Sequence, residues 1–154
     1  MPDMQSEVLV IGGGAAGMMA AITEAEAGAR VTLLERNEKV GRKLNITGKG
    51  RCNLTNNCSA EEALANVPRN SRFLFSAFSR FDSAAAMAFF EERGLALKTE
   101  RGNRVFPVSD SAYDVTDTLR AALRRNRVKI VHDRATDLLL DAEGHLQGVK
   151  GERG

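Results

Sequence analysis

The sequence predicts an α/β fold built around a parallel β-sheet. Three observations near the N-terminus lead to this class. A short apolar run at residues 8–11 is followed at once by glycines, an alanine- and methionine-rich helical stretch covers residues 15–27, and a second apolar run occupies residues 30–35. Strand, glycine turn, helix and strand within about 30 residues form a βαβ unit, whose crossover should be right-handed.

Length and composition are those of an ordinary soluble domain. The chain has 154 residues, of which 43% are hydrophobic and 27% charged, enough to bury a core. A formal net charge of +2 gives no reason to expect a nucleic-acid or membrane partner. The N-terminus has no basic segment followed by an apolar one, and no stretch approaches the roughly 20 apolar residues of a membrane helix. We therefore expect a cytoplasmic protein.

The first two strands and the helix between them each carry a local signal. The apolar run at residues 8–11 is typical of a strand buried on both faces of a sheet. Gly28 follows the helical stretch in the position where a helix commonly ends. Apolar and β-branched side chains continue through residues 30–35 and predict the second strand.

The middle of the chain is less regular. Glycine, lysine and asparagine dominate residues 38–58, which predicts a loop. Helices are expected near residues 71–81 and after Ser83, a candidate N-cap. Two short strands, residues 95–99 and 103–106, should form a hairpin.

The last third of the sequence predicts a helix, a strand and a hairpin. Asp114 is a candidate N-cap for an amphipathic helix that should end near Arg125, because apolar residues recur on one of its faces. Residues 128–131 are typical of a strand. Residues 136–140 and 145–149 should pair around a glycine turn.

The glycine turn after the first strand has the spacing of a phosphate-binding motif. Residues 12–17, GGGAAG, fit G-x-G-x-x-G between a strand and a helix. Gly12 permits the tight turn, Gly14 lets the backbone approach a pyrophosphate, and Gly17 lets the helix pack on the sheet. The free N–H groups of the first helical turn then face the phosphates. The pattern predicts an adenine dinucleotide site.

An acidic residue ends the second strand. Glu35 lies 18 residues after Gly17, where a carboxylate can accept hydrogen bonds from both ribose hydroxyls and would repel the 2′-phosphate of NADP. This position favours FAD or NAD. The alternative is a purely structural strand–turn–helix with an incidental glutamate.

A second glycine-rich segment carries a resemblance to a known family. Residues 41–56 have the sequence GRKLNITGKGRCNLTN, and residues 104–109 have the sequence RVFPVS. Both segments closely resemble motifs of the BaiN/RdsA-type flavoproteins, a bacterial family of NAD(P)/FAD-dependent oxidoreductases. The resemblance covers essentially the whole chain. It implies a Rossmann-like FAD-binding fold of the two-dinucleotide-binding flavoprotein type, with a small helical and hairpin insertion.

The resemblance also implies where a non-covalently bound FAD would lie. The first βαβ unit would hold its ADP half, with Arg42 and Lys43 near the ribose and pyrophosphate. Residues 48–53 would follow the ribityl chain or the isoalloxazine edge, and Ala135 would flank the adenine. The expected cofactor-binding residues are Gly12, Gly14, Ala15, Ala16, Gly17, Glu35, Arg36, Arg42, Lys43, Gly48, Gly50, Arg51, Cys52, Asn53 and Ala135.

The charge of this segment agrees with that placement. Residues 39–51 contain five cationic side chains and no acidic one, which suits a diphosphate. A solvated basic loop is the alternative interpretation of the same charge.

Other residues with reactive side chains are expected to be structural. The spacing of Cys52 and Cys58 suits neither a redox pair nor a zinc site, and Cys52 is expected to pack rather than to meet the flavin ring. His132 and His145 are expected at the surface, and Tyr113 in packing. Six phenylalanines are expected mostly in helix cores, with a wall of a substrate pocket as the alternative for some of them: Phe73, Phe75, Phe78, Phe81, Phe89 and Phe90. The sequence identifies no nucleophile, acid–base pair or metal site, and in a flavoenzyme the cofactor supplies the redox chemistry.

The predicted dinucleotide-binding fold lacks one strand beside residues 8–11. Residues 1–57 and 114–154 should form the Rossmann-like core, with residues 58–113 as the insertion. In the usual 3-2-1-4 strand order the first strand has a neighbour on each side, but residues 8–11 find only one. We therefore expect an N-terminal portion of a longer enzyme, inactive alone, with its catalytic residues beyond residue 154.

The leading functional hypothesis is an FAD-dependent oxidoreductase. NAD(P)H would donate hydride to the flavin, and an organic acceptor such as a conjugated C=C bond, or oxygen, would receive it. The resemblance implies both reduction of conjugated C=C bonds and amine oxidation, and the choice between reductase and oxidase stays open. The alternatives are an NAD-dependent dehydrogenase and a non-catalytic dinucleotide-binding fragment. A small-molecule substrate is expected, while its identity, the choice of NADH or NADPH and the oligomeric state stay open.

Overall fold

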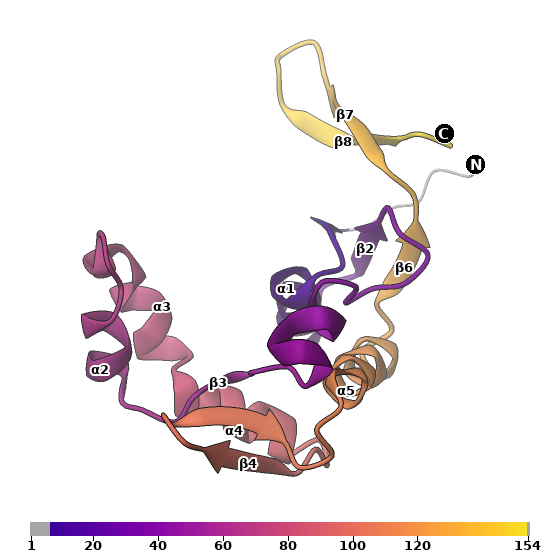
Figure 1. Cartoon of the computed structure of the whole chain (residues 1–154). Helices are drawn as coiled ribbons and strands as arrows, with labels where there is room; N and C mark the ends of the chain where they lie inside the picture. Colours follow the sequence, from indigo (N-terminus) through magenta and orange to yellow (C-terminus); the bar gives the residue numbers. More distant parts are fainter. Residues whose placement is uncertain (1–6, 154) are drawn as a thin grey trace. The chain divides into compact units, whose positions relative to one another are not determined.

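The computed structural model describes residues 7–153 (Figure 1). Its internal contacts divide the chain into two compact units. The first unit comprises residues 1–43 and 119–154, and the second comprises residues 44–118. Within the described residues, no helix combines the length and apolar character needed to cross a membrane.

A parallel sheet forms the centre of the first unit. Its strands are β1 (Val8–Ile11), β2 (Val31–Glu35) and β6 (Lys129–His132), in the order β1-β2-β6. Figure 1 shows the three strands with helix α1 (Ala15–Glu26) connecting the first two. This arrangement confirms the predicted α/β class and the βαβ unit.

Helix α1 packs on the sheet through small and flexible apolar residues. Met18, Ala21 and Ile22 are fully buried on one side of the helix. The helix ends as predicted, because Gly28 adopts a φ of +101°, a conformation that glycine accepts at little cost. Burying these side chains against β1 and β2 fixes the start of the helix directly after the glycine turn.

Strand β1 lies at the edge of the described sheet, whereas β2 lies in its middle. Every residue of β2 is buried, but Ile11 of β1 is 56% exposed and Leu9 is 37% exposed. The prediction that β1 is buried on both faces is therefore wrong for this chain. The reason is the one-sided pairing of β1, which among the described strands meets β2 alone.

Helix α5 (Ala112–Arg125) precedes the third strand of the sheet. It begins two residues before the expected N-cap Asp114, whose backbone N–H already donates to the carbonyl of Ser111. The expected apolar face is present. Its buried residues include Val115, Leu119, Ala122 and Leu123.

An antiparallel hairpin follows the sheet. Strands β7 (Ala135–Leu140) and β8 (Leu146–Gly151) pair in the expected manner, with irregularities in register between Ala135 and Asp137 and between Leu139 and Leu140. Leucine side chains on this hairpin are largely exposed. They are Leu138, Leu139, Leu140 and Leu146.

The second unit contains a small antiparallel sheet in the order β3-β5-β4. Strands β4 (Leu97–Glu100) and β5 (Arg104–Pro107) form the predicted hairpin, and Gly102 and Asn103 between them have positive φ angles. Strand β3 (Thr55–Asn56) pairs with β5, although the sequence predicted only loop in this stretch. Long-range pairing with residues about fifty positions away creates that strand.

Short helices make up the rest of the second unit. They are the 3₁₀ segments η1 (Leu44–Gly50) and η2 (Ser71–Leu74) and the α-helices α2 (Ala60–Ala65), α3 (Phe75–Arg80) and α4 (Ser83–Glu91). The expected continuous helix over residues 71–81 is thus a 3₁₀ turn followed by a short α-helix. Helix α2 was missed, although its capping box between Ser59 and Glu62 is a signal that the sequence carries.

The N-cap of α4 is Asp82 rather than Ser83. The Asp82 carboxylate accepts a hydrogen bond from the backbone N–H of Ala85 at 2.8 Å. Ser83 is buried instead, where its hydroxyl meets the hydroxyl of Thr55 at 3.1 Å. Aspartate is as favourable an N-cap as serine, so residue type alone gives no preference for Ser83 over Asp82.

The phenylalanines divide into buried and exposed groups. Phe90 is buried and meets the ring of Phe89 edge to face. Phe73, Phe75 and Phe81 are 78%, 66% and 45% exposed, so the expected helix-core role is wrong for these three. Phe73 and Phe75 belong to η2 and α3, two short helices without a buried residue, and Phe81 directly follows α3.

Candidate functional site

The glycine turn, residues 12–17, has the backbone geometry that its sequence predicts. Gly12 has a φ of +103°, and its N–H donates to the carbonyl of Leu34 at 2.7 Å, which ties the turn to β2. A Cβ atom at Gly17 would lie 1.8 Å from the carbonyl oxygen of Gly12, so only glycine fits there. At Gly14 the same construction finds open space within 4 Å. The turn is therefore tightly packed at Gly17 and has free space beside Gly14.

The start of α1 is free of side-chain caps. Its N-cap residue Gly14 provides no side-chain hydrogen bond, and Ala15 and Ala16 in the first turn are exposed. The first N–H groups of a helix have no partners inside the helix, and they favour an anion. The predicted phosphate position therefore has accessible donors and room above them.

Gly13 has a role that the sequence interpretation missed. It is buried, and a Cβ atom there would lie 2.7 Å from a methyl group of Val40 and 3.1 Å from the carboxylate of Glu35. The carbonyl of Gly13 also accepts a hydrogen bond from the N–H of Gly41 at 2.7 Å. The loop after β2 thus folds tightly onto the glycine turn.

Glu35 is buried and already hydrogen-bonded. One carboxylate oxygen accepts from the N–H of Gly13 at 2.7 Å, and the other accepts from the backbone N–H of Asn37 at 2.8 Å and from its side-chain amide. Burial alone raises the pKa of Glu35, but the hydrogen bonds from Asn37 and Gly13 together outweigh it, so the pKa lies below its ordinary value. The side chain is held ionised at neutral pH.

These bonds change the expected role of Glu35. A carboxylate oxygen has two lone pairs, so Oε1, which accepts both hydrogen bonds from Asn37, is fully used, whereas Oε2 can still accept one further hydrogen bond. Glu35 therefore both braces the glycine turn and presents the remaining acceptor capacity to a ligand.

A cavity of about 380 Å³ opens at the carboxyl ends of the parallel strands. Four of the predicted cofactor-binding residues line it: Gly12, Glu35, Arg36 and Ala135. The other lining residues are Ile11, Leu34, Asn37, Asp133 and Arg134. Ligands of open α/β sheets bind outside the carboxyl ends of the strands, and the volume suits a small-molecule site.

Asp133 is the second buried carboxylate of this cavity. Its oxygens accept hydrogen bonds from the backbone N–H groups of Arg134 at 2.7 Å and Arg153 at 3.2 Å. The sequence interpretation missed it, because nothing local distinguishes it from other loop aspartates. The available signal was its position directly after β6, next to His132, which pairs with Glu35 at the end of β2.

The glycine loop, defined here as residues 47–53, belongs to the second unit and has an unusual backbone. Gly48, Lys49, Gly50 and Cys52 all have positive φ angles, between +57° and +82°. The N–H of Cys52 donates to the carbonyl of Thr47 at 3.1 Å, which closes the loop on itself. Non-glycine residues adopt this conformation only when the surroundings hold them.

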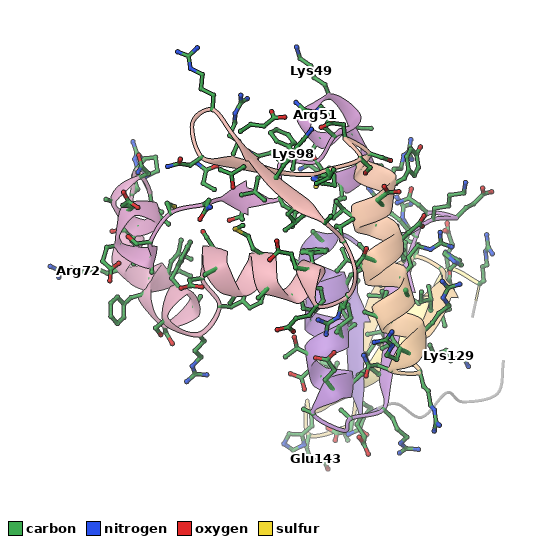
Figure 2. The ribbon with its side chains drawn as sticks, turned by 90° about the horizontal axis from the view of Figure 1, so that it is seen from below. Lys49, Arg51, Arg72, Lys98, Lys129 and Glu143 are labelled. Atoms are coloured by element: carbon green, nitrogen blue, oxygen red, sulfur yellow. The ribbon has the colours of Figure 1, made fainter. Side chains whose placement is uncertain are left out.

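Arg51 makes ion pairs inside the second unit. Its guanidinium donates to Asp110 at 2.8 and 2.6 Å and to Glu100 at 2.5 Å, and it lies 4.2 Å from the centre of the Phe106 ring. Lys98 meets the same two carboxylates at 2.7 and 3.5 Å. Figure 2 shows Arg51 and Lys98 close together. Lys49, which belongs to the same loop as Arg51, extends away from them.

This network weakens one reason for expecting a diphosphate at residues 39–51, namely the five cationic side chains of that segment. Hydrogen bonds from Lys98 and Arg51 lower the pKa of Asp110, and a hydrogen bond from Arg51 lowers that of Glu100, so both carboxylates are ionised at neutral pH. Two cations face two anions. The charge of Arg51 is therefore balanced within the protein, which the local sequence did not indicate.

The remaining predicted residues lie in varied settings. Arg42 is exposed and donates to the side-chain oxygen of Asn37 at 3.2 Å, and Lys43 is exposed. Cys52 is buried, and burial raises the pKa of its thiol, as suits a packing residue. The side-chain amide of Asn53 can donate to the carbonyl oxygens of Thr55 and Val105.

A family model for the HI0933-like protein Rossmann domain matches residues 6–152. The chain belongs to this family. The match confirms the resemblance expected from residues 41–56, and the family is one of flavoprotein oxidoreductases.

Two curated relatives give the extent of the likeness. The chain is 38% identical over 147 residues to a 3-dehydro-bile acid delta(4,6)-reductase of Clostridium scindens, covering 94% of this chain and 35% of the relative. It is 34% identical over 113 residues to a ribosomal RNA dihydrouridine synthase of Escherichia coli, covering 73% of this chain and 28% of the relative. The chain thus spans about a third of the length of these relatives.

Solved structures share the fold at low sequence identity. A 3-ketosteroid-delta4-(5alpha)-dehydrogenase from Rhodococcus jostii RHA1 gives a TM-score of 0.71 at 16% identity, covering 97% of this chain and 42% of that one. An L-proline dehydrogenase from P. horikoshii gives 0.63 at 15% identity, covering 100% and 50%. The chain therefore has the Rossmann-like fold that these structures share.

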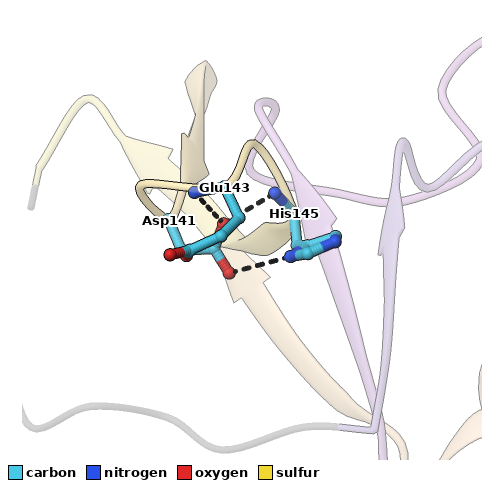
Figure 3. Close-up of side chains that lie close together, drawn as sticks. All are labelled: Asp141, Glu143 and His145. Carbon is cyan, nitrogen blue, oxygen red and sulfur yellow. Dashed lines mark hydrogen bonds and ion pairs between the residues drawn. The ribbon is translucent and has the colours of Figure 1, made fainter.

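Two further features lie outside the cavity, a cluster of acidic and histidine side chains and an exposed tyrosine. Asp141, Glu143 and His145 place potential metal-ligating atoms within 4.8 Å of one another (Figure 3). The Asp141 carboxylate accepts from the backbone N–H groups of His145 and Glu143, as expected for an aspartate that closes a hairpin turn. Tyr113 is 64% exposed, contrary to the expected packing role.

Proposed function

We propose that the protein binds FAD non-covalently and works as an NAD(P)H-linked oxidoreductase. The observation that carries the proposal is the cavity beside the glycine turn, in which an ionised Glu35 lies at the end of β2. The flavoprotein family to which the chain belongs supports FAD over NAD as its ligand. When bound, FAD supplies the hydride-transfer chemistry.

The residues of the first unit fit the ADP half of such a cofactor. The uncapped first turn of α1 supplies N–H donors for a diphosphate, and the open space before Gly14 lets it come close. Glu35 and Asp133 supply acceptors for ribose hydroxyls. Because Glu35 is ionised, it disfavours a 2′-phosphate, so the cavity suits FAD or NAD rather than NADP.

For the substrate we propose a molecule with a C=C bond conjugated to a carbonyl group. The names of the two relatives describe a delta(4,6)-reductase and a dihydrouridine synthase, and both reactions saturate a carbon–carbon double bond. In such a reduction one hydride and one proton add across the double bond, while NAD(P)H becomes NAD(P)⁺.

An absorbance spectrum of the purified protein tests the cofactor. A bound oxidised flavin gives two bands in the visible region, and we expect these bands at about one flavin per chain. A colourless protein that binds NAD tightly would instead support the NAD-dependent dehydrogenase. A protein that binds neither FAD nor NAD would contradict the dinucleotide site itself.

The variant Glu35→Arg tests the cavity. It replaces an acceptor of ribose hydroxyls by a bulky cation, and we expect FAD affinity to fall by about tenfold or more. The exposed residue Glu38 offers a matched control, because Glu38→Arg makes the same change of charge outside the cavity lining. Unchanged affinity in the Glu35 variant would remove this residue from the site.

A further inference from the structure

The glycine loop is braced by a network of side chains from the β4–β5 hairpin. Arg51 reaches Glu100 at the end of β4 and Asp110 after β5. These partners are 49 and 59 positions away in the sequence. Arg51 therefore connects the loop to the end of β4 and to the turn that follows β5.

The ring of Phe106 extends this brace to the other side of the loop. The Arg51 guanidinium lies 4.2 Å from the ring centre. A Cβ atom at Gly48 would come within 3.3 Å of the same ring and 3.0 Å of the backbone nitrogen of Asn53. The Phe106 ring thus lies close to both Gly48 and Arg51, and the loop leaves no room at position 48 for a larger side chain.

The loop needs such a brace because its backbone is in a costly conformation. Lys49 and Cys52 both have a φ of +57°, which side-chain-bearing residues rarely adopt. Its backbone ties include the Cys52 N–H to the Thr47 carbonyl and the Leu54 N–H to the Val105 carbonyl at 2.9 Å. The ion pairs of Arg51 with Glu100 and Asp110 add charged contacts to these backbone hydrogen bonds.

We propose that Arg51 is a positioning residue, which holds the glycine loop in its flavin-binding shape through Glu100, Asp110 and Phe106 and does not itself bind the cofactor diphosphate. This inference rests on the proposed FAD function for the identity of the ligand. It differs from the simplest interpretation of a basic loop, in which each cation contacts phosphate.

The charge balance of the network supports a positioning role. Arg51 and Lys98 are offset by Glu100 and Asp110, so the cluster has no surplus positive charge for a diphosphate. Two of the three guanidinium nitrogens, Nε and Nη2, already donate to the carboxylates. A bidentate grip on phosphate would require Arg51 to abandon one of these partners.

The double variant Glu100→Gln/Asp110→Asn separates the two roles by the sign of its effect. It retains Arg51 and the shapes of both side chains but removes the two negative charges. If Arg51 acts through these carboxylates, FAD affinity falls by about tenfold or more. If Arg51 binds phosphate directly, the released cation leaves affinity equal or increases it, and the proposal is overturned.

A matched control changes the same charge elsewhere in the second unit. Glu91 and Glu92 are exposed residues at the end of α4, so Glu91→Gln/Glu92→Gln removes two carboxylates without touching the network. We expect this variant to bind FAD as the unchanged protein does. Affinity is measured by titration, with circular dichroism to verify folding, and the single variants replace the double one if it does not fold.

Variants of Arg51 itself provide a second readout. Arg51→Lys keeps one ion pair and should recover part of the affinity that Arg51→Ala loses. The triple variant Arg51→Ala/Glu100→Gln/Asp110→Asn should lose no more FAD affinity than Arg51→Ala alone. The reason is that all three substitutions disrupt the same network. Fully additive losses would contradict the network.

Hydrogen exchange without added flavin keeps this proposal separate from the proposed function. In the Glu100→Gln/Asp110→Asn variant we expect the amides of residues 51, 52 and 54, each an observed donor, to exchange about tenfold faster or more. Unchanged exchange would overturn the positioning role even if flavin binds. A protein that never binds flavin would end the FAD proposal, while the exchange result would still decide whether Arg51 holds the loop.

Discussion

Two glycine-rich segments of this chain use charged residues in opposite ways. In the glycine turn of the first unit, backbone N–H groups at the start of α1 have no side-chain cap, and the ionised Glu35 faces a cavity. In the glycine loop of the second unit, Arg51 is paired with carboxylates of the same unit. The first segment thus keeps helix N–H groups available to a ligand, whereas in the second the charge of Arg51 is already balanced within the protein.

Substitutions at two glycines of the turn should have very different effects on stability. Gly17→Ala places a Cβ atom against the Gly12 carbonyl, and we expect it to lower the free energy of unfolding by roughly 3 kcal/mol or more. Gly14→Ala meets open space and should leave stability nearly unchanged while weakening dinucleotide binding. Urea denaturation measures the first effect and a flavin titration the second. Equal destabilisation by both changes would contradict the geometry of the turn.

Removing the charge of Glu35 should have the next largest effect. In Glu35→Gln one side-chain oxygen becomes a donor that faces the N–H groups of Gly13 or Asn37. We expect the free energy of unfolding to fall by about 1–3 kcal/mol, the usual cost of an unpaired buried group. Asp137→Asn on the exposed hairpin is the matched control. Equal stability of the two variants would show that Glu35 does not brace the turn.

The pH dependence of the turn follows from the lowered pKa of Glu35. A carboxylate whose pKa in the folded protein lies below its ordinary value of 4.5 stabilises the fold above that value. This contribution is lost as the pH falls through the lower, folded-state pKa. Stability measured from pH 7 downward should therefore decline below about pH 4.5, and Glu35→Gln should show less of this decline. An identical decline in both proteins would contradict the assignment.

The smallest expected effect concerns the two cysteines. Burial raises the pKa of the Cys52 thiol, whereas Cys58 is partly exposed. Because the thiolate is the reactive form, Cys58 should react first with a thiol reagent under native conditions. Labelling followed by mass spectrometry of peptides measures the order. Faster labelling of Cys52 would mean that the glycine loop opens readily, and would weaken the case for a braced loop.

Local sequence signals were sufficient for the parts of the fold that depend on neighbouring residues. The strand, glycine turn and helix that begin at Val8 follow from apolar runs and glycine positions, and Gly28 ends α1 as expected. The capping box at Ser59, which begins the unpredicted helix α2, is also a local signal. Backbone preferences and caps act over a few residues, so a single sequence carries them.

The features that escaped prediction depend on contacts between distant residues. Strand β3 exists because residue Thr55 pairs with Val105, and the charge of Arg51 is balanced by Glu100 and Asp110. Asp133 joins the cavity because β6 lies beside β2. Composition within a loop cannot reveal partners contributed by another element. The cofactor-binding set as a whole stays a prediction.

One measurement tests most directly whether the glycine turn and the glycine loop differ as described. ADP carries the adenine, ribose and diphosphate of FAD, so it can be titrated into isotope-labelled protein while backbone amide resonances are followed. The account predicts saturable shifts at residues 12–17, at Glu35 and its neighbours and at residues 133–135, with little change at Arg51. Shifts centred on Arg51 and the glycine loop, with the glycine turn unaffected, would contradict it.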